Sequence, residues 1–407
     1  MKKILKISLI FTLLAIIYVY VLAITNLPDT LILFEGENIK INKVYGLNID
    51  LKENTYETAL TSSNVGKTSF FKEGKAILTA SLFDFPIKDI EVNVIEKTTV
   101  IPVGEVIGIK MYTKGVLVVG MAEIEGQKPY NNTAIQEGDV ITNIGDKEIK
   151  NTSDLIECIN KSNGEKLEIT YINNGETKEC NITPVKNEEG EYKIGLWVRD
   201  SAAGIGTLTF YEPESENFVA LGHGIADVDT NELINISRGE LVTTQILSIV
   251  KGESGKPGKI QGTVEKQKNI GSIYRNTNLG IYGKVTNHSN LLVNYSKSMK
   301  VAMRDEIQLG KAQILCNVDE NVEIEEYEIE ILKKFTTNNY DNKSMLIKVT
   351  DEKLIEKTGG IVQGMSGSPI VQNGKFVGAV THVIVNNPKE GYAVFGDMLI
   401  KQMKSVK

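Results

Sequence analysis

A glycine-rich stretch near the C-terminus, Thr358-Gly-Gly-Ile-Val-Gln-Gly-Met-Ser-Gly-Ser-Pro-Ile-Val371, decides how the rest of the chain is interpreted. It continues into Asn373-Gly374, a strong signal for a two-residue hairpin turn. The apolar runs on either side of that turn, Ile370-Val371 and Phe376-Val377, should therefore pair as antiparallel strands. The stretch predicts a tight loop of small residues that leads directly into a β-hairpin.

The loop has the chemistry of an exposed nucleophile. Small residues on both sides of Ser366 let the backbone fold closely around it, so the amides of Gly364 and Ser366 can point at one oxyanion while the hydroxyl faces a carbonyl. Ser368 is the alternative nucleophile, and the following Pro369 disfavours it. We expect Ser366 to be the nucleophile and Gly364 and Ser366 to form the oxyanion hole.

A nucleophilic serine needs a base, and the whole chain contains three histidines. His223 stands between two glycines at the end of an expected strand, which predicts an accessible imidazole. His288 belongs to a polar turn, and His382 lies on the returning strand of the Ser366 hairpin, where we expect it to line a pocket or to pack. His223 is the preferred base, and its long separation from Ser366 fits two β-barrels that meet at a cleft.

The acid that would orient the base is not decided by spacing. Asp227 and Asp229 lie close to His223 in the sequence, and Asp305 is a further candidate. Asp351 precedes the expected helical segment 352–357, where it can also act as a helix N-cap. The residues alone leave these alternatives open.

Length and composition limit the class of protein. At about 150 residues per domain, 407 residues predict two to three domains. The net charge of -7 argues against duplex nucleic acid as a partner, because phosphate binding needs a concentrated basic face. The three cysteines, Cys158, Cys180 and Cys316, form no zinc-type pair and allow at most one disulfide.

The N-terminus predicts export. Lys2, Lys3 and Lys6 precede about twenty mostly apolar residues, and no further charge occurs until Asp29. We expect residues 1–26 to be an uncleaved signal-anchor that spans the membrane, with its N-terminus in the cytoplasm and the rest outside. A weak small-residue site at 21–23 leaves cleavage open as the alternative.

Two units should precede the part that carries Ser366. Residues 27–99 alternate apolar and polar positions between turns, which predicts a small β-sandwich. Residues 100–187 contain Ala134-Ile-Gln-Glu-Gly-Asp-Val-Ile141 and then Ser153-Asp-Leu155 at a short helix, a pattern that resembles a PDZ domain of the bacterial protease form. Thr152 or Ser153 should cap that helix.

The PDZ resemblance implies a groove that takes an extended peptide as an added strand, with the loop for the peptide end near Val103–Ile109. A PDZ-like unit that only packs against its neighbour is the alternative.

The motifs around His223 and Ser366 resemble those of trypsin-like serine peptidases. Together with the N-terminal anchor and the PDZ pattern, Leu221-Gly-His-Gly-Ile-Ala-Asp-Val-Asp-Thr230 and the 358–370 motif are similar to the stage IV sporulation protein B family of sporulation serine peptidases. That resemblance implies Ser366 as nucleophile, His223 as general base and Asp351 as the acid.

The resemblance also implies a place and a target. Members of this family act in the space between the two membranes of the developing spore, process themselves, and cleave a regulator of the membrane metalloprotease that activates a late mother-cell sigma factor. A second copy of the chain would engage in trans through the PDZ domain.

The sequence therefore predicts a mainly β protein with an N-terminal transmembrane helix, a small β-domain, a PDZ domain and, over 194–407, a chymotrypsin-like double β-barrel peptidase. No metal or organic cofactor and no nucleic acid partner is expected. A non-catalytic PDZ scaffold that recruits a membrane partner and a general envelope protease are the alternative functions.

Overall fold

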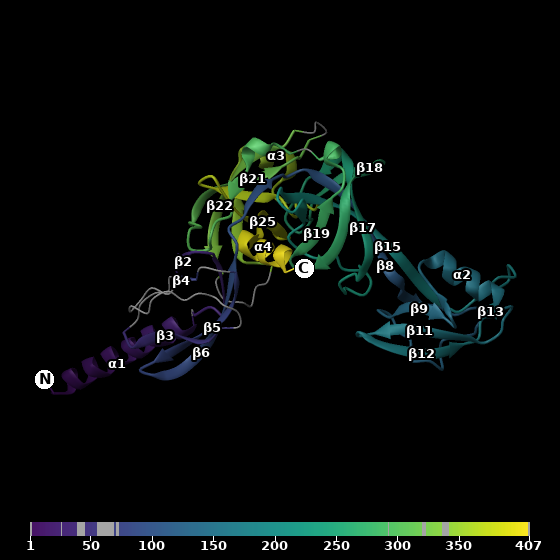
Figure 1. Ribbon diagram of the computed structural model, residues 1–407, viewed down its shortest axis with the longest axis horizontal. Helices are drawn as coiled ribbons and strands as arrows, with labels where there is room; N and C mark the ends of the chain where they lie inside the picture. Colours follow the sequence, from purple (N-terminus) through teal and green to yellow (C-terminus); the bar gives the residue numbers. More distant parts are fainter. Residues whose placement is uncertain are drawn as a thin grey trace.

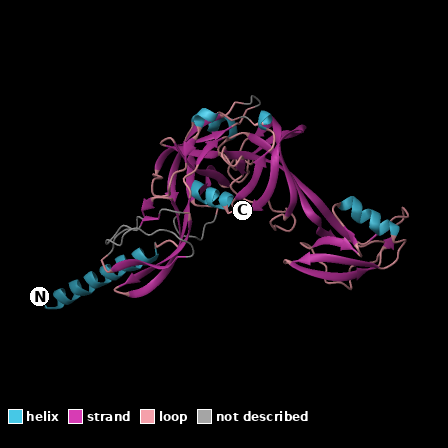
Figure 2. Ribbon diagram, in the orientation of Figure 1, coloured by secondary structure: helices cyan, strands magenta, loops and turns pink. Residues whose placement is uncertain are grey.

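Strands dominate the computed structural model, which describes residues 2–25, 27–38, 45–54, 69–70, 73–291, 293–319, 323–335 and 342–405 (Figure 2). The α-helices in these ranges are α1 (Lys2–Thr25), α2 (Thr152–Lys161), α3 (Glu352–Thr358) and α4 (Gly396–Lys404). The expected mainly β class is confirmed.

Six strands form a first barrel, because β15 pairs back onto β8 and closes the ring. The hairpin expected around residues 204–222 is present as β15 and β16, with Glu212 opposite Asn217. Apolar side chains such as Ile107, Phe218 and Leu241 fill the interior. In ring order the strands are β8 (Val106–Met121), β17 (Ile236–Val250), β18 (Lys259–Thr277), β19 (Gly280–Val285), β16 (Asn217–Ala220) and β15 (Leu196–Glu212).

A second closed barrel carries the hairpin predicted from Asn373-Gly374. Asn373 and Gly374 have φ of 52° and 72°, the left-handed pair that a type I′ turn requires. Val371 faces Phe376 as expected, while Ile370 faces Gly378 because the register shifts between them. In ring order the strands are β21 (Gly310–Cys316), β22 (Glu325–Lys334), β23 (Met345–Val349), β26 (Asn387–Phe395), β25 (Lys375–Ile384) and β24 (Pro369–Gln372).

The PDZ unit projects from the first barrel on the two long strands β8 and β15 (Figure 1). It contains α2 and the strands β9 (Val140–Ile144), β10 (Lys147–Glu148), β11 (Leu167–Asn173) and β12 (Glu176–Ile182). We expected consecutive units over 100–187 and 194–407. In the structure the PDZ unit is an insertion, since the first half of β8 belongs to the barrel that β15 completes.

Two local expectations for the PDZ unit differ from the structure. Residues Val103–Ile109, expected as a peptide-end loop, are buried, and from Val106 on they belong to β8; a Cβ on Gly104 would lie 2.7 Å from the Leu315 carbonyl oxygen. The cap of α2 is Asn151, whose side chain accepts a hydrogen bond from the Asp154 amide, one residue earlier than expected.

The described part of 27–99 forms a single four-stranded sheet and a separate pair of short strands, not the expected sandwich. The sheet order is β1-β6-β5-β3, and its apolar face packs in one cluster with Leu399, Ile400 and Met403 of α4. Its strands are β1 (Thr30–Phe34), β3 (Leu47–Asn54), β5 (Gly74–Leu82) and β6 (Phe85–Ile95), and the short pair is β2 (Glu37–Asn38) and β4 (Ser69–Phe70).

Further short strands are β7 (Thr99–Pro102), β13 (Val185–Lys186), β14 (Tyr192–Lys193) and β20 (Met299–Lys300). Helix α1 covers the segment expected as an anchor. Over the described residues, no helix reaches the length and apolar character needed to cross a membrane. All three cysteines are free.

Candidate active site

A cavity of about 430 Å³ lies where the two barrels meet, and both Ser366 and His223 line it. The first barrel contributes Ala202–Ile205 of β15 and the residues that follow β16, including Leu221 and His223. The second barrel contributes the Ser366 loop and Thr381–Val383 of β25. Two of the three side chains predicted to be catalytic are therefore brought together from positions far apart in the chain.

Thr207 on β15 holds the loop that carries Ser366. Its amide donates a hydrogen bond to the Ser366 carbonyl oxygen (3.0 Å), and its hydroxyl donates to the Gly364 carbonyl oxygen (2.7 Å). Gly367 has a φ of 98°, and a Cβ there would lie 2.2 Å from the Thr207 carbonyl oxygen, so only glycine fits this close approach. Thr207 was not predicted, because nothing in the local pattern marks it as different from other strand threonines.

Two backbone amides of the same loop remain available to bind an oxyanion. The amides of Met365, Gly367 and Ser368 donate to Val362, Val380 and Met365 carbonyl oxygens, respectively. Within the described ranges, the amides of Gly364 and Ser366 donate to no protein acceptor. An oxyanion hole needs such preorganised free donors beside the nucleophile.

The Ser366 hydroxyl donates to the Thr381 carbonyl oxygen at 2.8 Å. This is a resting contact, because a carbonyl oxygen cannot take the hydroxyl proton. Ser368, the alternative nucleophile, is fully buried. Its position excludes direct contact with a substrate in this conformation.

His223 follows two residues in left-handed conformation, Leu221 (φ 73°) and Gly222 (φ 67°). A bulky residue such as leucine adopts this region at a cost, and such strain is common at functional sites. The Nδ1 atom of His223 lies 2.8 Å from the Gly224 carbonyl oxygen. Because a carbonyl oxygen only accepts, Nδ1 carries the proton in this contact and Nε2 is left free to act as the base.

Burial lowers the pKa of His223 below its ordinary value of 6.5, and the hydrogen bond to the Gly224 carbonyl partly opposes that shift. The imidazole is thus neutral at neutral pH, as a general base must be.

The other two histidines occupy different surroundings. His382 lines the cavity, as expected, and its ring centroid lies 5.3 Å from that of His223. His288 stands outside the cavity, at the start of a short 3₁₀ turn, with its Nε2 3.1 Å from the Tyr211 hydroxyl.

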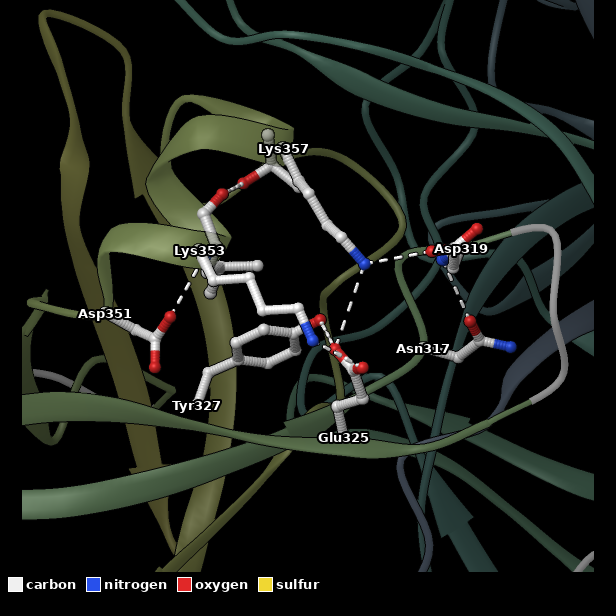
Figure 3. Close-up of polar contacts among 9 residues, drawn as sticks. Asn317, Asp319, Glu325, Tyr327, Asp351, Lys353 and Lys357 are labelled. Carbon is white, nitrogen blue, oxygen red and sulfur yellow. Dashed lines mark hydrogen bonds and ion pairs between the residues drawn. The ribbon is translucent and has the colours of Figure 1, made fainter.

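Asp351 caps helix α3 (Figure 3). One carboxylate oxygen accepts from the Leu354 amide (3.1 Å) and the other from the Glu328 amide (3.2 Å). The figure places it beside an ion-pair network in which Glu325 accepts from Lys353 at 2.7 Å. Asp351 does not line the cavity, and neither of its two hydrogen bonds is with His223, whose Nδ1 meets the Gly224 carbonyl oxygen instead.

The other carboxylates considered for the acid are also placed elsewhere. Asp227 and Asp229 both bind the guanidinium of Arg199. Neither they nor Asp305 lines the cavity.

Comparison with known proteins gives two family matches. The family described as SpoIVB peptidase S55 matches residues 190–400, just over half of the chain, and the PDZ domain family matches residues 105–183. No curated protein matches the chain.

Two solved structures are similar in part. The PDZ domain of an SdrC-like protein from Listeria monocytogenes is 22% identical, with 21% of this chain and 87% of that one covered and a TM-score of 0.19. The inactive form of the Rv3671c protease is 10% identical, with 50% and 84% covered and a TM-score of 0.27. Such low scores carry no conclusion, whereas the peptidase family match extends over the Ser366 loop and His223. The chain belongs to the SpoIVB peptidase S55 family and is a serine peptidase.

Proposed function

We propose that the chain is an endopeptidase with Ser366 as nucleophile, His223 as general base and the Gly364 and Ser366 amides as the oxyanion hole. The observation that carries this proposal is the convergence of Ser366 and His223 on one cavity, beside two amides that have no protein acceptor in the described ranges.

The chemistry is acyl transfer. The Ser366 hydroxyl leaves the Thr381 carbonyl, passes its proton to Nε2 of His223 and attacks a peptide carbonyl, whose oxygen is stabilised by the two amides. His223 then gives the proton to the leaving amine, and water releases the acyl-enzyme by the same steps. Rotation of Oγ away from Thr381 is the change that substrate binding has to produce.

The PDZ unit supplies a means of recruiting a protein. Along Leu196–Arg199, β15 pairs with β8 on one side, and among the described strands none pairs with its other side. Asp200, the next residue, accepts a hydrogen bond from the Thr152 amide at the start of α2. An extended peptide added to this edge beside α2 would bind in the PDZ manner, on a strand that continues into the catalytic cavity.

The family membership and the N-terminal sequence support a proposal for the biological setting. The enzyme acts in sporulation signalling, where it processes itself, in trans through the PDZ unit, and cleaves a regulator of the membrane metalloprotease that activates a late mother-cell sigma factor. Three lysines before an uncharged segment support export and anchoring by residues 1–26, with the bulk of the chain between the forespore and mother-cell membranes.

The test is self-cleavage of the full chain, followed by intact mass over hours. We expect discrete fragments from the wild type and none from Ser366→Ala. Ser368→Ala is the matched control, because the same change is made two residues away at a buried hydroxyl, and it should cleave as the wild type does. Fragments from Ser366→Ala, or none from a folded wild type, would contradict the proposal.

Substrate breadth separates the signalling role from a general envelope protease. A signalling peptidase should cut denatured casein at few sites or none, whereas extensive digestion would favour the general protease.

A further inference from the structure

The cavity contains a second histidine that the reaction described above does not use. The rings of His382 and His223 are 5.3 Å apart between centroids, with their planes inclined by 38°. The Nδ1 atom of His382 is buried and has no hydrogen-bond partner in the described part of the chain. Since an unpaired buried polar atom costs free energy, its presence in an active-site cavity calls for a functional reason.

The strand that carries His382 contains a bulge at this point. Strands β25 and β26 pair antiparallel, and their register shifts between Val380 and His382, which leaves Thr381 as an extra residue on β25. A bulge bends its strand and redirects the side chains next to it, and such bulges are common beside active sites. The extra residue also provides the carbonyl that holds the Ser366 hydroxyl. One irregularity thus sets both the resting contact of the nucleophile and the place of His382.

Among the described residues, no carboxylate binds His223. In a serine peptidase a third group usually binds the second ring nitrogen of the base and orients it. At His223 that nitrogen meets the Gly224 carbonyl oxygen, and the carboxylates of Asp227 and Asp351 are bound elsewhere. The ionisable side chain that accompanies His223 and Ser366 in the cavity is His382.

We propose that His382 is a positioning residue for the general base. Its neutral imidazole packs beside His223 and keeps that ring oriented for proton transfer with Ser366. In the acylation step the Ser366 O–H bond breaks, the Oγ–C bond forms, and the proton passes to Nε2 of His223, so His382 itself takes up no proton. This inference rests on the proposed function, because it assigns a role in the same reaction.

The charge state of His382 suits this role. Burial, together with repulsion from the neighbouring His223 and Lys343, lowers its pKa to about 4. Lys343 lies over the ring of Tyr392, which faces His382 from β26. An imidazole that stays neutral does not repel the imidazolium that His223 becomes, whereas a protonated His382 would.

The test measures how fast a fluorophosphonate probe labels Ser366 in the full chain. The serine attacks phosphorus and fluoride leaves, so intact mass follows the reaction without a known substrate. His382→Phe fills a similar volume without ring nitrogens, and we expect labelling to slow by about 10- to 100-fold, less than the ~10⁴ lost when a triad carboxylate is replaced. His288→Phe is the matched control, because His288 lies outside the cavity, and it should label at the wild-type rate.

A second variant separates positioning from packing. In His382→Ala, dissolved imidazole can occupy the vacated space, so we expect it to restore labelling in a saturable way. Water admitted beside His223 relieves the burial that lowers its pKa, so that pKa should rise. The pH below which the labelling rate falls should therefore be higher in His382→Ala than in the wild type.

Thermal unfolding shows whether each variant is folded. Wild-type labelling of a folded His382→Phe would overturn the proposal, as would a loss in folded His382→Ala that imidazole leaves unchanged. Failure of the wild type itself to react would instead contradict the proposed function, and this inference with it.

Discussion

At the residue scale, the assignment of Asp351 is the sharpest difference between resemblance and structure. The resemblance implies the acid of a triad, while one carboxylate oxygen accepts the Leu354 amide in the first turn of α3 and the other accepts the Glu328 amide on β22. Asparagine can keep one of these two bonds through its single side-chain oxygen, whereas alanine keeps neither. We therefore expect Asp351→Ala to lose about 1 kcal/mol of unfolding free energy, as caps typically provide, and Asp351→Asn to lose less.

The Asp351→Asn variant also tests whether Asp351 acts in catalysis. Asp351→Asn should keep most of the fluorophosphonate labelling rate if the carboxylate acts as a cap. A large loss of labelling in this variant, at unchanged stability in urea unfolding, would return Asp351 to the role that the resemblance implies.

Two residues of the site, Ser366 and His223, could be predicted from the sequence. Ser366 and His223 stand in glycine-rich surroundings that have few structural uses other than exposing a side chain, and the structure places both on one cavity. Asp351 could not be decided in this way, because a carboxylate before a helix has the same local pattern whether it caps or catalyses. The nearness of His382 to His223 depends on a bulge and on the meeting of two barrels, neither of which leaves a mark in the sequence.

At the scale of elements, β15 connects the PDZ unit, the cavity and the nucleophile loop. Thr207 lies on this strand and donates its hydroxyl to the Gly364 carbonyl. Thr207→Val keeps the shape and removes that bond. We expect the labelling rate of Ser366 to fall by about 10-fold, less than the ~10²–10³ lost when an oxyanion donor is deleted outright.

Thr209 provides the matched control for this change. It lies two residues further along β15, equally buried, and its hydroxyl has no hydrogen-bond partner in the described ranges. Thr209→Val should therefore label as the wild type does. Equal losses in the two variants would show that the effect comes from strand packing and not from the hydrogen bond of Thr207 to Gly364.

Hairpins could be predicted from the sequence, whereas pairing between strands far apart in the chain could not. The β15–β16 hairpin and the Asn373-Gly374 turn were predicted, because their turn residues fix local geometry. The insertion of the PDZ unit into the first barrel was not, because a long strand such as β8 changes pairing partners along its length without a change in its own apolar pattern. Pairing between distant strands is a property of the folded sheet and not of either segment.

At the scale of the whole molecule, α4 joins the second barrel to the N-terminal sheet through one apolar cluster. Its first turn contains Asp397, a fully buried carboxylate bound by Arg304 Nε at 2.7 Å. Burial raises the pKa of Asp397, and Arg304 opposes that shift. Arg304→Met would leave a buried carboxyl without its cation, so we expect a loss of about 3 kcal/mol in unfolding free energy.

An exposed pair gives the control for Arg304. Lys311 binds Glu328 at 3.2 Å on the surface of the second barrel, with 83% of its side chain exposed. Lys311→Met should cost about 0.5 kcal/mol or less in the same denaturant titration, as exposed ion pairs do. Comparable losses of unfolding free energy in Arg304→Met and Lys311→Met would contradict a stabilising role specific to the buried pair.

The central claim is that Ser366 and His223, brought together by two barrels, form the active site of this serine peptidase. The most direct measurement is to react the full chain with a fluorophosphonate, digest it and locate the adduct by mass spectrometry in the wild type and in His223→Ala. We predict an adduct on Ser366 in the wild type and its near-complete loss in a folded His223→Ala. An adduct on Ser368 or another residue, or undiminished labelling of Ser366 without His223, would contradict the account.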